Sequence, residues 1–213
     1  MNQLILTALL VASSLCALGV DVSQLYSSAT YTCIKNAGYS FLVIRGYCSY
    51  GAVDPHITDN LNNARAAGFS PDIYMFPCRG KSATAQVDQM IAGIASNLYG
   101  KVWIDVETNP STGCGWGTDH AGNCNFLTET VNRIKSHGKV PGIYASKYMW
   151  TTILGSLDAC KGLGAEELWY AHYDNVPSFA DFTPFGGWTK PTYKQFLGTN
   201  TVCSAGVDKN YKA

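Results

Sequence analysis

The sequence predicts one α/β domain folded as a closed barrel of the TIM type. In the last third of the chain, loops replace the helices between strands. Five short apolar runs in the first part of the chain are each followed by an amphipathic segment, the pattern of repeated strand–helix units. Three more apolar runs follow, with loops between them. The alternative is an open doubly wound sheet. We disfavour it because no Gly-x-Gly-x-x-Gly follows the first strand and the runs are evenly spaced.

The elements follow from hydrophobic periodicity and from turn residues. The run 41–47 is continuous and β-branched, as in strands buried on both faces. Asp54 and Pro55 suit the N-cap and first position of a helix that ends at Gly68. The expected strands are 19–23, 41–47, 72–76, 101–107, 141–145, 167–172, 192–197 and 206–210. The expected helices are 31–38, 54–68, 83–97, 125–137 and 147–154.

Length and charge limit the class of protein. A chain of 213 residues fits one domain, and its 12% aromatic and 14% charged content argues against disorder. Lys and Arg number 15, as do Asp and Glu, and the net charge of +0 gives no support for a nucleic-acid partner.

The beginning of the chain resembles a secretory leader. Residues 4–12 are apolar but too few to span a bilayer, and small residues follow them. We expect a signal peptide of residues 1–17, ending between 17 and 19, and a single domain over 18–213. The alternative is a buried N-terminal strand or helix. No later apolar stretch is long enough for a membrane anchor.

Eight cysteines indicate an oxidising compartment. Cys114 and Cys124 bracket a glycine-rich loop, and we expect them to pair. Cys48 and Cys78 each end a predicted strand, and these strands should be neighbours, so a second pair is expected there. Since removal of the leader leaves an odd number, one of the remaining three should stay free: Cys33, Cys160 or Cys203. The spacing does not fit a zinc site.

Two acids share one face of the fourth predicted strand. Side chains alternate along a strand, so Asp105 and Glu107 point to the side of Trp103, opposite the apolar residues between them. In a barrel this side is the interior, near the C-terminal strand ends where active sites lie. Carboxylates about 6.5 Å apart disfavour each other's ionisation, so one should hold a proton near neutral pH, as a general acid must. The alternatives are a solvated turn, a structural ion pair or a Mg or Ca site.

Other polar and aromatic residues fall at the same strand ends. Asp21 and Asp208 alternate with valines and should face inward, and Arg45 in an apolar strand needs a carboxylate partner. Aromatic walls with scattered polar groups suit sugar rings, although core packing is the alternative for each aromatic. The four histidines form no metal or triad pattern, but His172 lies on a strand and could line the groove. The residues we expect to bind substrate are Tyr47, Tyr74, Trp103, Tyr144, Trp169, His172 and Gln195.

Six segments occur in order along the chain: Gly19-Val-Asp-Val-Ser23, Trp103-Ile-Asp-Val-Glu107, Pro141-Gly-Ile-Tyr-Ala145, Leu168-Trp-Tyr-Ala-His-Tyr173, Tyr193-Lys-Gln-Phe196 and Val207-Asp208. Together they resemble glycoside hydrolase family 25, the Chalaropsis-type N-acetylmuramidases, and within it the lysozymes of Entamoeba and nematodes. An Asp-x-Glu strand also occurs in chitinases, whereas the ordered set is highly specific. The likeness covers essentially the whole chain after the leader.

This resemblance implies a (β/α)5(β)3 barrel that cleaves the β-1,4 bond between N-acetylmuramic acid and N-acetylglucosamine in peptidoglycan. It implies Glu107 as the proton donor, and Asp105 as the group that assists the substrate's acetamido nucleophile. Asp21 and Asp208 would hold the network and bind substrate. This substrate-assisted scheme departs from the usual two-carboxylate scheme.

The resemblance also implies no metal or cofactor, and a monomer whose partner is bacterial peptidoglycan. The protein would be secreted, or held in the lumen of phagosomes, lysosomes or granules, for antibacterial defence or digestion of bacteria. One rival is a chitinase-like hydrolase, disfavoured by the Asp21 strand and the short chain. The other is an inactive peptidoglycan-binding relative, disfavoured because Asp105 and Glu107 are both present.

Overall fold

The computed structural model describes residues 16–163 and 167–213 and confirms the closed barrel. The expected signal peptide lies almost wholly outside the described residues, and its expected end falls where β1 begins. The barrel strands are β1 (Ala17–Val22), β2 (Tyr39–Cys48), β4 (Asp72–Met75), β5 (Val102–Asp105), β6 (Pro141–Ala145), β7 (Glu167–Ala171), β8 (Tyr193–Val202) and β9 (Ala205–Lys212). A two-residue strand that the sequence did not predict, β3 (Ala52–Val53), pairs with the end of β2.

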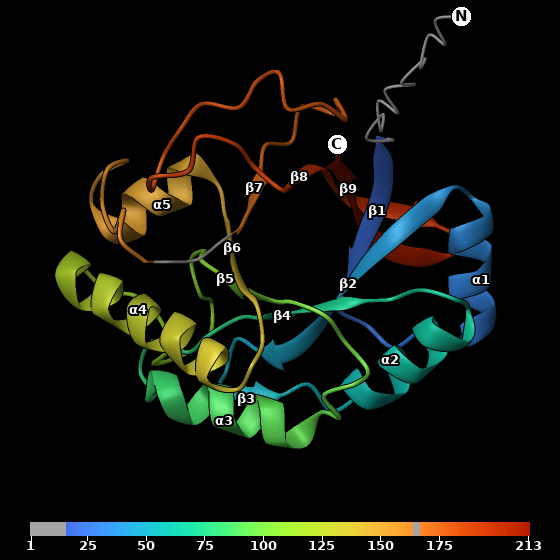
Figure 1. Cartoon of the computed structure of the whole chain (residues 1–213), viewed down its shortest axis with the longest axis horizontal. Coiled ribbons are helices and arrows are strands. Elements are labelled where there is room, and N and C mark those ends of the chain that lie inside the picture. The colour runs from blue at the N-terminus through green and yellow to red at the C-terminus, as the bar shows by residue number, and fades with distance from the viewer. Residues whose placement is uncertain (1–15, 164–166) are drawn as a thin grey trace, which may run out of the picture.

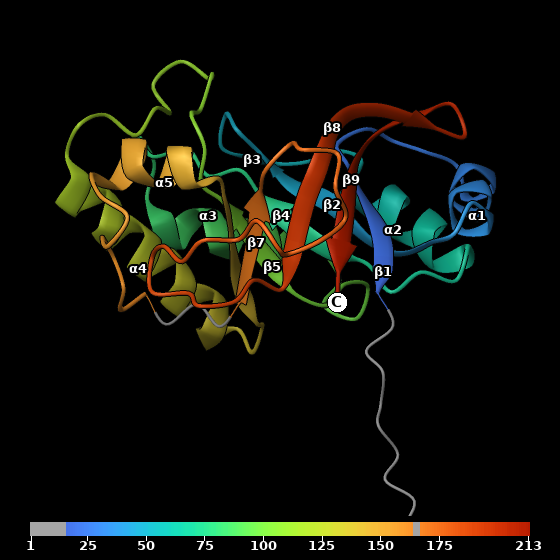
Figure 2. The same ribbon diagram turned by 90° about the horizontal axis from the view of Figure 1, so that it is seen from above.

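The sheet closes because β1 pairs with both β2 and β9. Neighbouring strands are parallel from β1 through β2 and β4 to β8, whereas β9 is antiparallel to both β8 and β1. The helices surround the side formed by the first strands, and loops cover β7 to β9 (Figure 1). Strands β8 and β9 form a long hairpin that lies beside β1 (Figure 2).

Five helices follow the first barrel strands: α1 (Ser28–Asn36), α2 (Ile57–Ala66), α3 (Ala83–Gly93), α4 (His120–Ser136) and α5 (Lys147–Leu154). Side chains of Ser27, Ser82, Asp119 and Ser146 cap four of them. Over the described residues, no helix has the length and apolarity needed to cross a membrane.

The expected start of the second helix at Asp54 is wrong. Helix α2 begins at Ile57, after His56. Asp54 Oδ1 accepts a hydrogen bond from the His56 backbone N at 2.9 Å, and Oδ2 accepts one from Arg45 Nε at 2.7 Å. Asp54 is therefore the carboxylate partner that Arg45 in its apolar strand requires.

The molecule has two apolar cores, one on each side of the barrel wall. The larger lies between the wall and the helices. The smaller fills the barrel interior with Phe41, Val43, Trp103, Tyr144, Trp169 and Tyr193. Two glycines make room for its rings, because a Cβ at Gly19 would lie 2.4 Å from Phe41 and one at Gly142 would lie 2.4 Å from Trp103.

The expected disulfide pairs are wrong. The structure has three other disulfides, Cys33–Cys203, Cys78–Cys114 and Cys124–Cys160, and these support the expected oxidising compartment. The loop after β5 returns to β4, where Arg79 N donates to Cys114 O, so Cys78 is the partner of Cys114. Cys124 lies inside α4, which begins earlier than expected, and is bonded to the segment after α5. Cys48 is buried and free.

Candidate active site

The alternation of β5 places its two acids at the carboxyl end of the barrel interior. Ile104 and Val106 pack into the outer core, whereas Asp105 and Glu107 line a pocket inside the barrel. Glu107 lies just beyond the end of β5. A hydrogen bond holds its backbone there, because Trp116 Nε1 donates to the Glu107 carbonyl at 2.8 Å. Trp116 comes from the glycine-rich loop and was not predicted to contribute.

The pocket has a volume of about 100 Å³ and is enclosed by residues from most of the barrel strands. Its four acids come from three parts of the chain that the barrel closure brings together, since β1, β5 and β9 each supply a strand end. The lining residues are Asp21, Tyr74, Asp105, Glu107, Tyr144, Trp169, Tyr173, Gln195 and Asp208.

Asp105 is the most deeply buried of the four acids. It is only 5% exposed, and its Oδ1 is buried and accepts no hydrogen bond from any described residue. Burial raises its pKa well above the ordinary value, and the charges of Glu107 and Asp21 add to this effect. Burial also raises the pKa of Glu107, with a further contribution from Asp208.

Asp21 has the opposite environment, because two amide groups donate to it. Its Oδ1 accepts hydrogen bonds from Asn210 Nδ2 at 2.7 Å and from Gln195 Nε2 at 2.9 Å. Burial and the nearby Asp208 raise the pKa of Asp21 to about 7, and both amides oppose the rise. Burial raises the pKa of Asp208 as well, while a hydrogen bond from the Thr199 backbone N opposes this.

Gln195 joins these acids to the aromatic rim. Its Oε1 accepts hydrogen bonds from the hydroxyl groups of Tyr144 at 2.6 Å and Tyr173 at 2.7 Å, while Nε2 donates to Asp21 and Asp208. The amide is thus fully used by the protein. This geometry suits a residue that positions others. Gln195 also lines the pocket, and its direct contact with substrate stays a prediction.

Sequence reasoning missed two residues of this network. Asn210 is fully buried, and its Oδ1 accepts a hydrogen bond from Trp169 Nε1 at 2.8 Å. It lies two residues after Asp208 on the same strand, so alternation could have identified it. Tyr173 follows β7 in a loop, where no periodicity applies.

Three of the expected substrate-binding residues do not line this pocket. Tyr47 points outward, with its hydroxyl donating to Gln89, because a register shift between Arg45 and Tyr47 breaks the alternation of β2. Trp103 lies deeper in the barrel, among the rings of the inner core. His172 is at the rim, in an adjoining depression of about 270 Å³.

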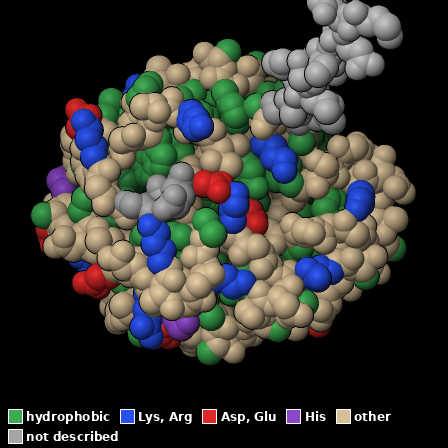
Figure 3. All heavy atoms as spheres, viewed as in Figure 1, with side chains coloured by type: hydrophobic (Ala, Val, Ile, Leu, Met, Phe, Trp, Pro, Cys, Tyr) green, Lys and Arg blue, Asp and Glu red, His purple; other side chains and the backbone are tan. Residues whose placement is uncertain are grey.

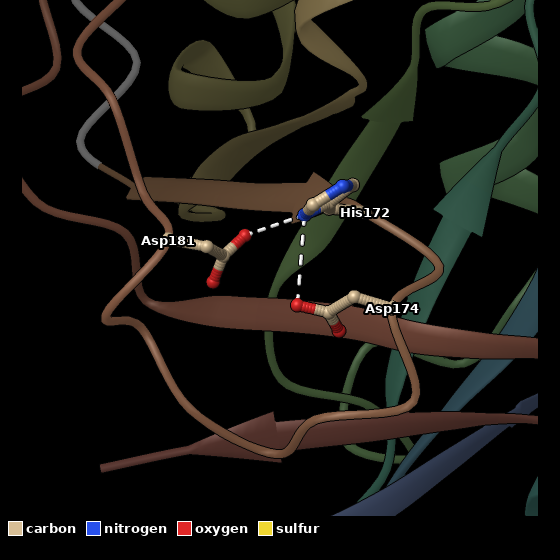
Figure 4. A group of neighbouring side chains, drawn as sticks. All are labelled: His172, Asp174 and Asp181. Carbon is tan, nitrogen blue, oxygen red and sulfur yellow. Dashed lines mark hydrogen bonds and ion pairs between the residues drawn. The ribbon is translucent and has the colours of Figure 1, made fainter.

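A cluster of His172, Asp174 and Asp181 lies beside this rim (Figure 4). His172 Nδ1 is 2.6 Å from Asp181 Oδ2 and 3.6 Å from Asp174 Oδ2. The fully buried ammonium of Lys194 lies 2.7 Å from a carboxylate oxygen of each aspartate. Burial would raise the pKa of Asp181, but hydrogen bonds from Lys194, His172 and Tyr170 lower it to about 2. A lysine therefore supplies the cation that balances this cluster.

The acid pocket can supply both a proton and a negative charge, because it brings four carboxyl groups with raised pKa values into one small space. Neutral carboxyl groups at near-neutral pH are the requirement for general acid catalysis at a glycosidic oxygen. The aromatic rim of Tyr74, Tyr144 and Tyr173 offers flat surfaces for a sugar ring.

The chain is similar to known lysozymes over almost its whole length. The family model described as lysozyme-like protein 1 matches residues 12–196. Lysozyme-like protein 5 of Caenorhabditis elegans is 38% identical over 99% of both chains, and probable GH family 25 lysozyme 2 of Dictyostelium discoideum is 39% identical over 91% of this chain and 89% of its own. The bacterial lysozyme of Streptomyces coelicolor superposes with a TM-score of 0.75 at 26% identity, over 91% of this chain and 90% of that one. This chain therefore belongs to the glycoside hydrolase family 25 lysozymes.

Proposed function

We propose that this glycoside hydrolase cleaves the β-1,4 bond between N-acetylmuramic acid and N-acetylglucosamine in peptidoglycan, with Glu107 as acid and base and Asp105 assisting the substrate's acetamido group. The observation that carries the proposal is the convergence of four carboxyl groups in one small pocket. Burial raises the pKa of every one of them. A structural role does not require four acids in such a place.

Glu107 is the proton donor in this scheme. Glu107 lies at the open end of the acid pocket, because it lines both this pocket and the adjoining depression. A glycosidic oxygen can approach it there. Burial and the charge of Asp208 raise the pKa of Glu107, which favours the protonated form that a proton donor needs. After the proton passes to the leaving oxygen, the carboxylate of Glu107 takes a proton from the water that completes hydrolysis.

Asp105 assists the internal nucleophile. The acetamido carbonyl oxygen of the substrate attacks the anomeric carbon as the bond to the leaving oxygen breaks, and the acetamido N–H then carries positive charge. Asp105 Oδ1 is an acceptor that no described residue uses. An N–H donated to it lowers the pKa of Asp105 and lets its negative charge stabilise the cyclic intermediate.

Asp21 and Asp208 bind the sugar and hold the hydrogen-bond network of the pocket in place. Asp21 receives donors from Asn210 and Gln195, so among the four acids it is the best supported as an anion. Asp208 shares Gln195 with it. Substrate hydroxyl groups can donate to either carboxylate, and the ring packs on the tyrosines of the rim.

The setting we propose is extracellular, or the lumen of phagosomes, lysosomes or granules, with the enzyme acting as a monomer in digestion of bacteria or in defence. The three disulfides support an oxidising compartment. On the face in Figure 3, Lys and Arg side chains lie scattered among uncharged groups. Together with the net charge of +0, this favours recognition of the wall by contacts in the cleft over long-range attraction.

The test is clearing of a peptidoglycan suspension by wild type and by Glu107→Gln. We expect the variant to lose at least about 100-fold in rate, as loss of a general acid does. Glu129→Gln, an exposed change on α4, is the matched control and should clear at the wild-type rate. Equal clearing by Glu107→Gln would exclude the assigned role. Cleavage of chitin oligomers in place of peptidoglycan would favour a chitinase, and binding without turnover a carbohydrate-binding relative.

A further inference from the structure

A large apolar pocket lies next to the acid pocket, outside the barrel wall. Its volume is about 660 Å³, and it lies between α5, the end of β7 and the segment 181–185. Tyr170 on β7 belongs to the outer core and forms part of the base of this pocket. The lining residues are Ser146, Lys147, Tyr148, Thr151, Leu157, Tyr170, Ala171, His172, Asp181, Phe182, Thr183 and Phe185.

The apolar pocket is continuous with the catalytic cleft through the depression of about 270 Å³. The depression shares Glu107, Tyr144 and Tyr173 with the acid pocket. It shares Ser146, Ala171 and His172 with the apolar pocket. A branched substrate held at Glu107 could therefore extend one branch past Ala171 into the apolar pocket.

The polar groups along the apolar pocket are mostly engaged within the protein. Ser146 Oγ caps α5 by accepting from Met149 N, and Thr151 Oγ1 donates to the Lys147 carbonyl. The Tyr170 hydroxyl donates to Asp181, to which His172 is also bonded. A sugar needs many hydrogen-bonding partners along both walls, whereas a short aliphatic chain does not.

The outer wall of the apolar pocket is held in place before any ligand arrives. Asp181 lies in that wall and is tied to Lys194 on β8, which is fully buried (Figure 4 shows Asp181 and its neighbours). On the opposite side, Lys147 Nζ donates to Thr183 Oγ1 at 2.9 Å and has further N–H groups to offer. Lys147 is exposed on α5, so it places one positive charge at the edge of an apolar space.

We propose that this pocket binds the peptide stem carried by the muramic acid residue whose bond is cleaved at Glu107. The stem leaves the sugar as a side branch, and it combines small aliphatic residues with free carboxylates. The aliphatic part matches the walls formed by Leu157, Phe182 and Phe185, and a carboxylate matches Lys147. The inference rests on the proposed muramidase function and adds a second determinant of substrate choice.

The experiment fills the pocket without touching the acids. Thr151→Trp projects a large side chain into the pocket from an exposed position on α5, and Thr152→Trp is the matched control because the next residue is also exposed but does not line the pocket. Each protein is assayed on peptidoglycan strands that keep their peptide stems, and on the same strands after an amidase has removed the stems. Thermal unfolding confirms that both variants fold.

Wild type and Thr152→Trp should cut the stem-bearing strands about 10-fold or more faster than the bare strands, the range for loss of small apolar contacts. Thr151→Trp should remove this preference and leave the rate on bare strands unchanged. Lys147→Gln should reduce the preference in part. If wild type cuts both substrates equally, or if Thr151→Trp slows both equally, the stem-binding proposal is wrong while the lysozyme function stands. If wild type cuts neither substrate, the proposed function itself fails.

Discussion

At the scale of single residues, hydrogen bonding distinguishes acids that burial alone would treat alike. Asp21 and Asp105 are both almost fully buried, and burial raises the pKa of both. Two amides donate to Asp21, whereas Asp105 Oδ1 receives nothing from the described residues. The proton shared among these acids is therefore favoured on Asp105 and disfavoured on Asp21 until a substrate N–H supplies the missing donor.

Asn210→Ala tests this division. The change removes a donor to the Asp21 anion, so the pKa of Asp21 should rise above about 7 and the acid limb of the activity profile should move to higher pH. The pH dependence of kcat for wild type and variant measures the shift. Asn62→Ala, exposed on α2, serves as the control. A lower rate with an unchanged pH profile would mean that Asn210 only supports the fold.

Alternation along strands predicted which acids enter the pocket, because Asp21, Asp105 and Asp208 lie in or beside regular apolar strands. The same rule failed at Tyr47, where the register shift in β2 turns the side chain outward. A shift of this kind depends on the neighbouring strand and leaves no mark in local sequence. Trp116 and Tyr173 were missed because both come from loops, whose paths tertiary contacts decide.

At the scale of elements, the barrel depends on close fits between strands and the rings that fill its interior. Gly142 on β6 lies against Trp103 on β5, and Trp103 in turn contacts Trp169 and Tyr193 with ring centroids 5.8 and 4.9 Å apart. These rings form the floor beneath the acids. The glycine is therefore required for space, since its φ is not in the left-handed region.

Gly142→Ala should destabilise the protein by about 1–3 kcal/mol, the usual cost of overpacking a core. The added Cβ would lie 2.4 Å from Trp103, which is fully buried and packs against the rings of Trp169 and Tyr193. Urea unfolding measures the change. Gly162→Ala is the control, because a Cβ there meets no atom within 4 Å. Equal stability of the two variants would show that the floor can relax.

The type and order of the barrel elements could be predicted from the sequence, whereas their ends and cross-links could not. Strand–helix alternation gave five helices, but α4 begins at His120 and not near residue 125, because Asp119 caps it. Because of this difference Cys124 lies on a helix, and it is bonded to Cys160 and not to Cys114 as expected. Disulfide partners depend on which loops meet in space, and spacing along the chain does not report this.

At the scale of the whole molecule, two groups of carboxyls act on stability in opposite directions. Burial raises the pKa of Asp21 from 3.8 to about 7, so between these values the unfolded chain binds fewer protons than the folded protein. The stability from the neutral acid is thus present below about pH 4 and is lost as pH rises toward 7. Hydrogen bonds hold the pKa of Asp88 and Asp181 near 2, so their contribution is lost as pH falls below about 4.

The free energy of unfolding should therefore be greatest at mildly acidic pH, about 4 to 5, and should fall toward neutral pH. Asp21→Asn removes the buried acid, so it should flatten the fall between pH 4 and 7 and make the protein more stable at pH 7. Denaturant unfolding across pH 3 to 8 measures both curves. A wild-type stability that rises steadily up to pH 7 would contradict the burial of neutral acids.

The most direct measurement is the identity of the new reducing ends released from purified wall glycan, trapped by borohydride reduction. We expect reduced N-acetylmuramic acid from wild type and Glu129→Gln, and none above background from Glu107→Gln. Reduced N-acetylglucosamine as the product, or muramic ends released equally by Glu107→Gln, would contradict the proposal that Glu107 protonates the glycosidic oxygen between N-acetylmuramic acid and N-acetylglucosamine.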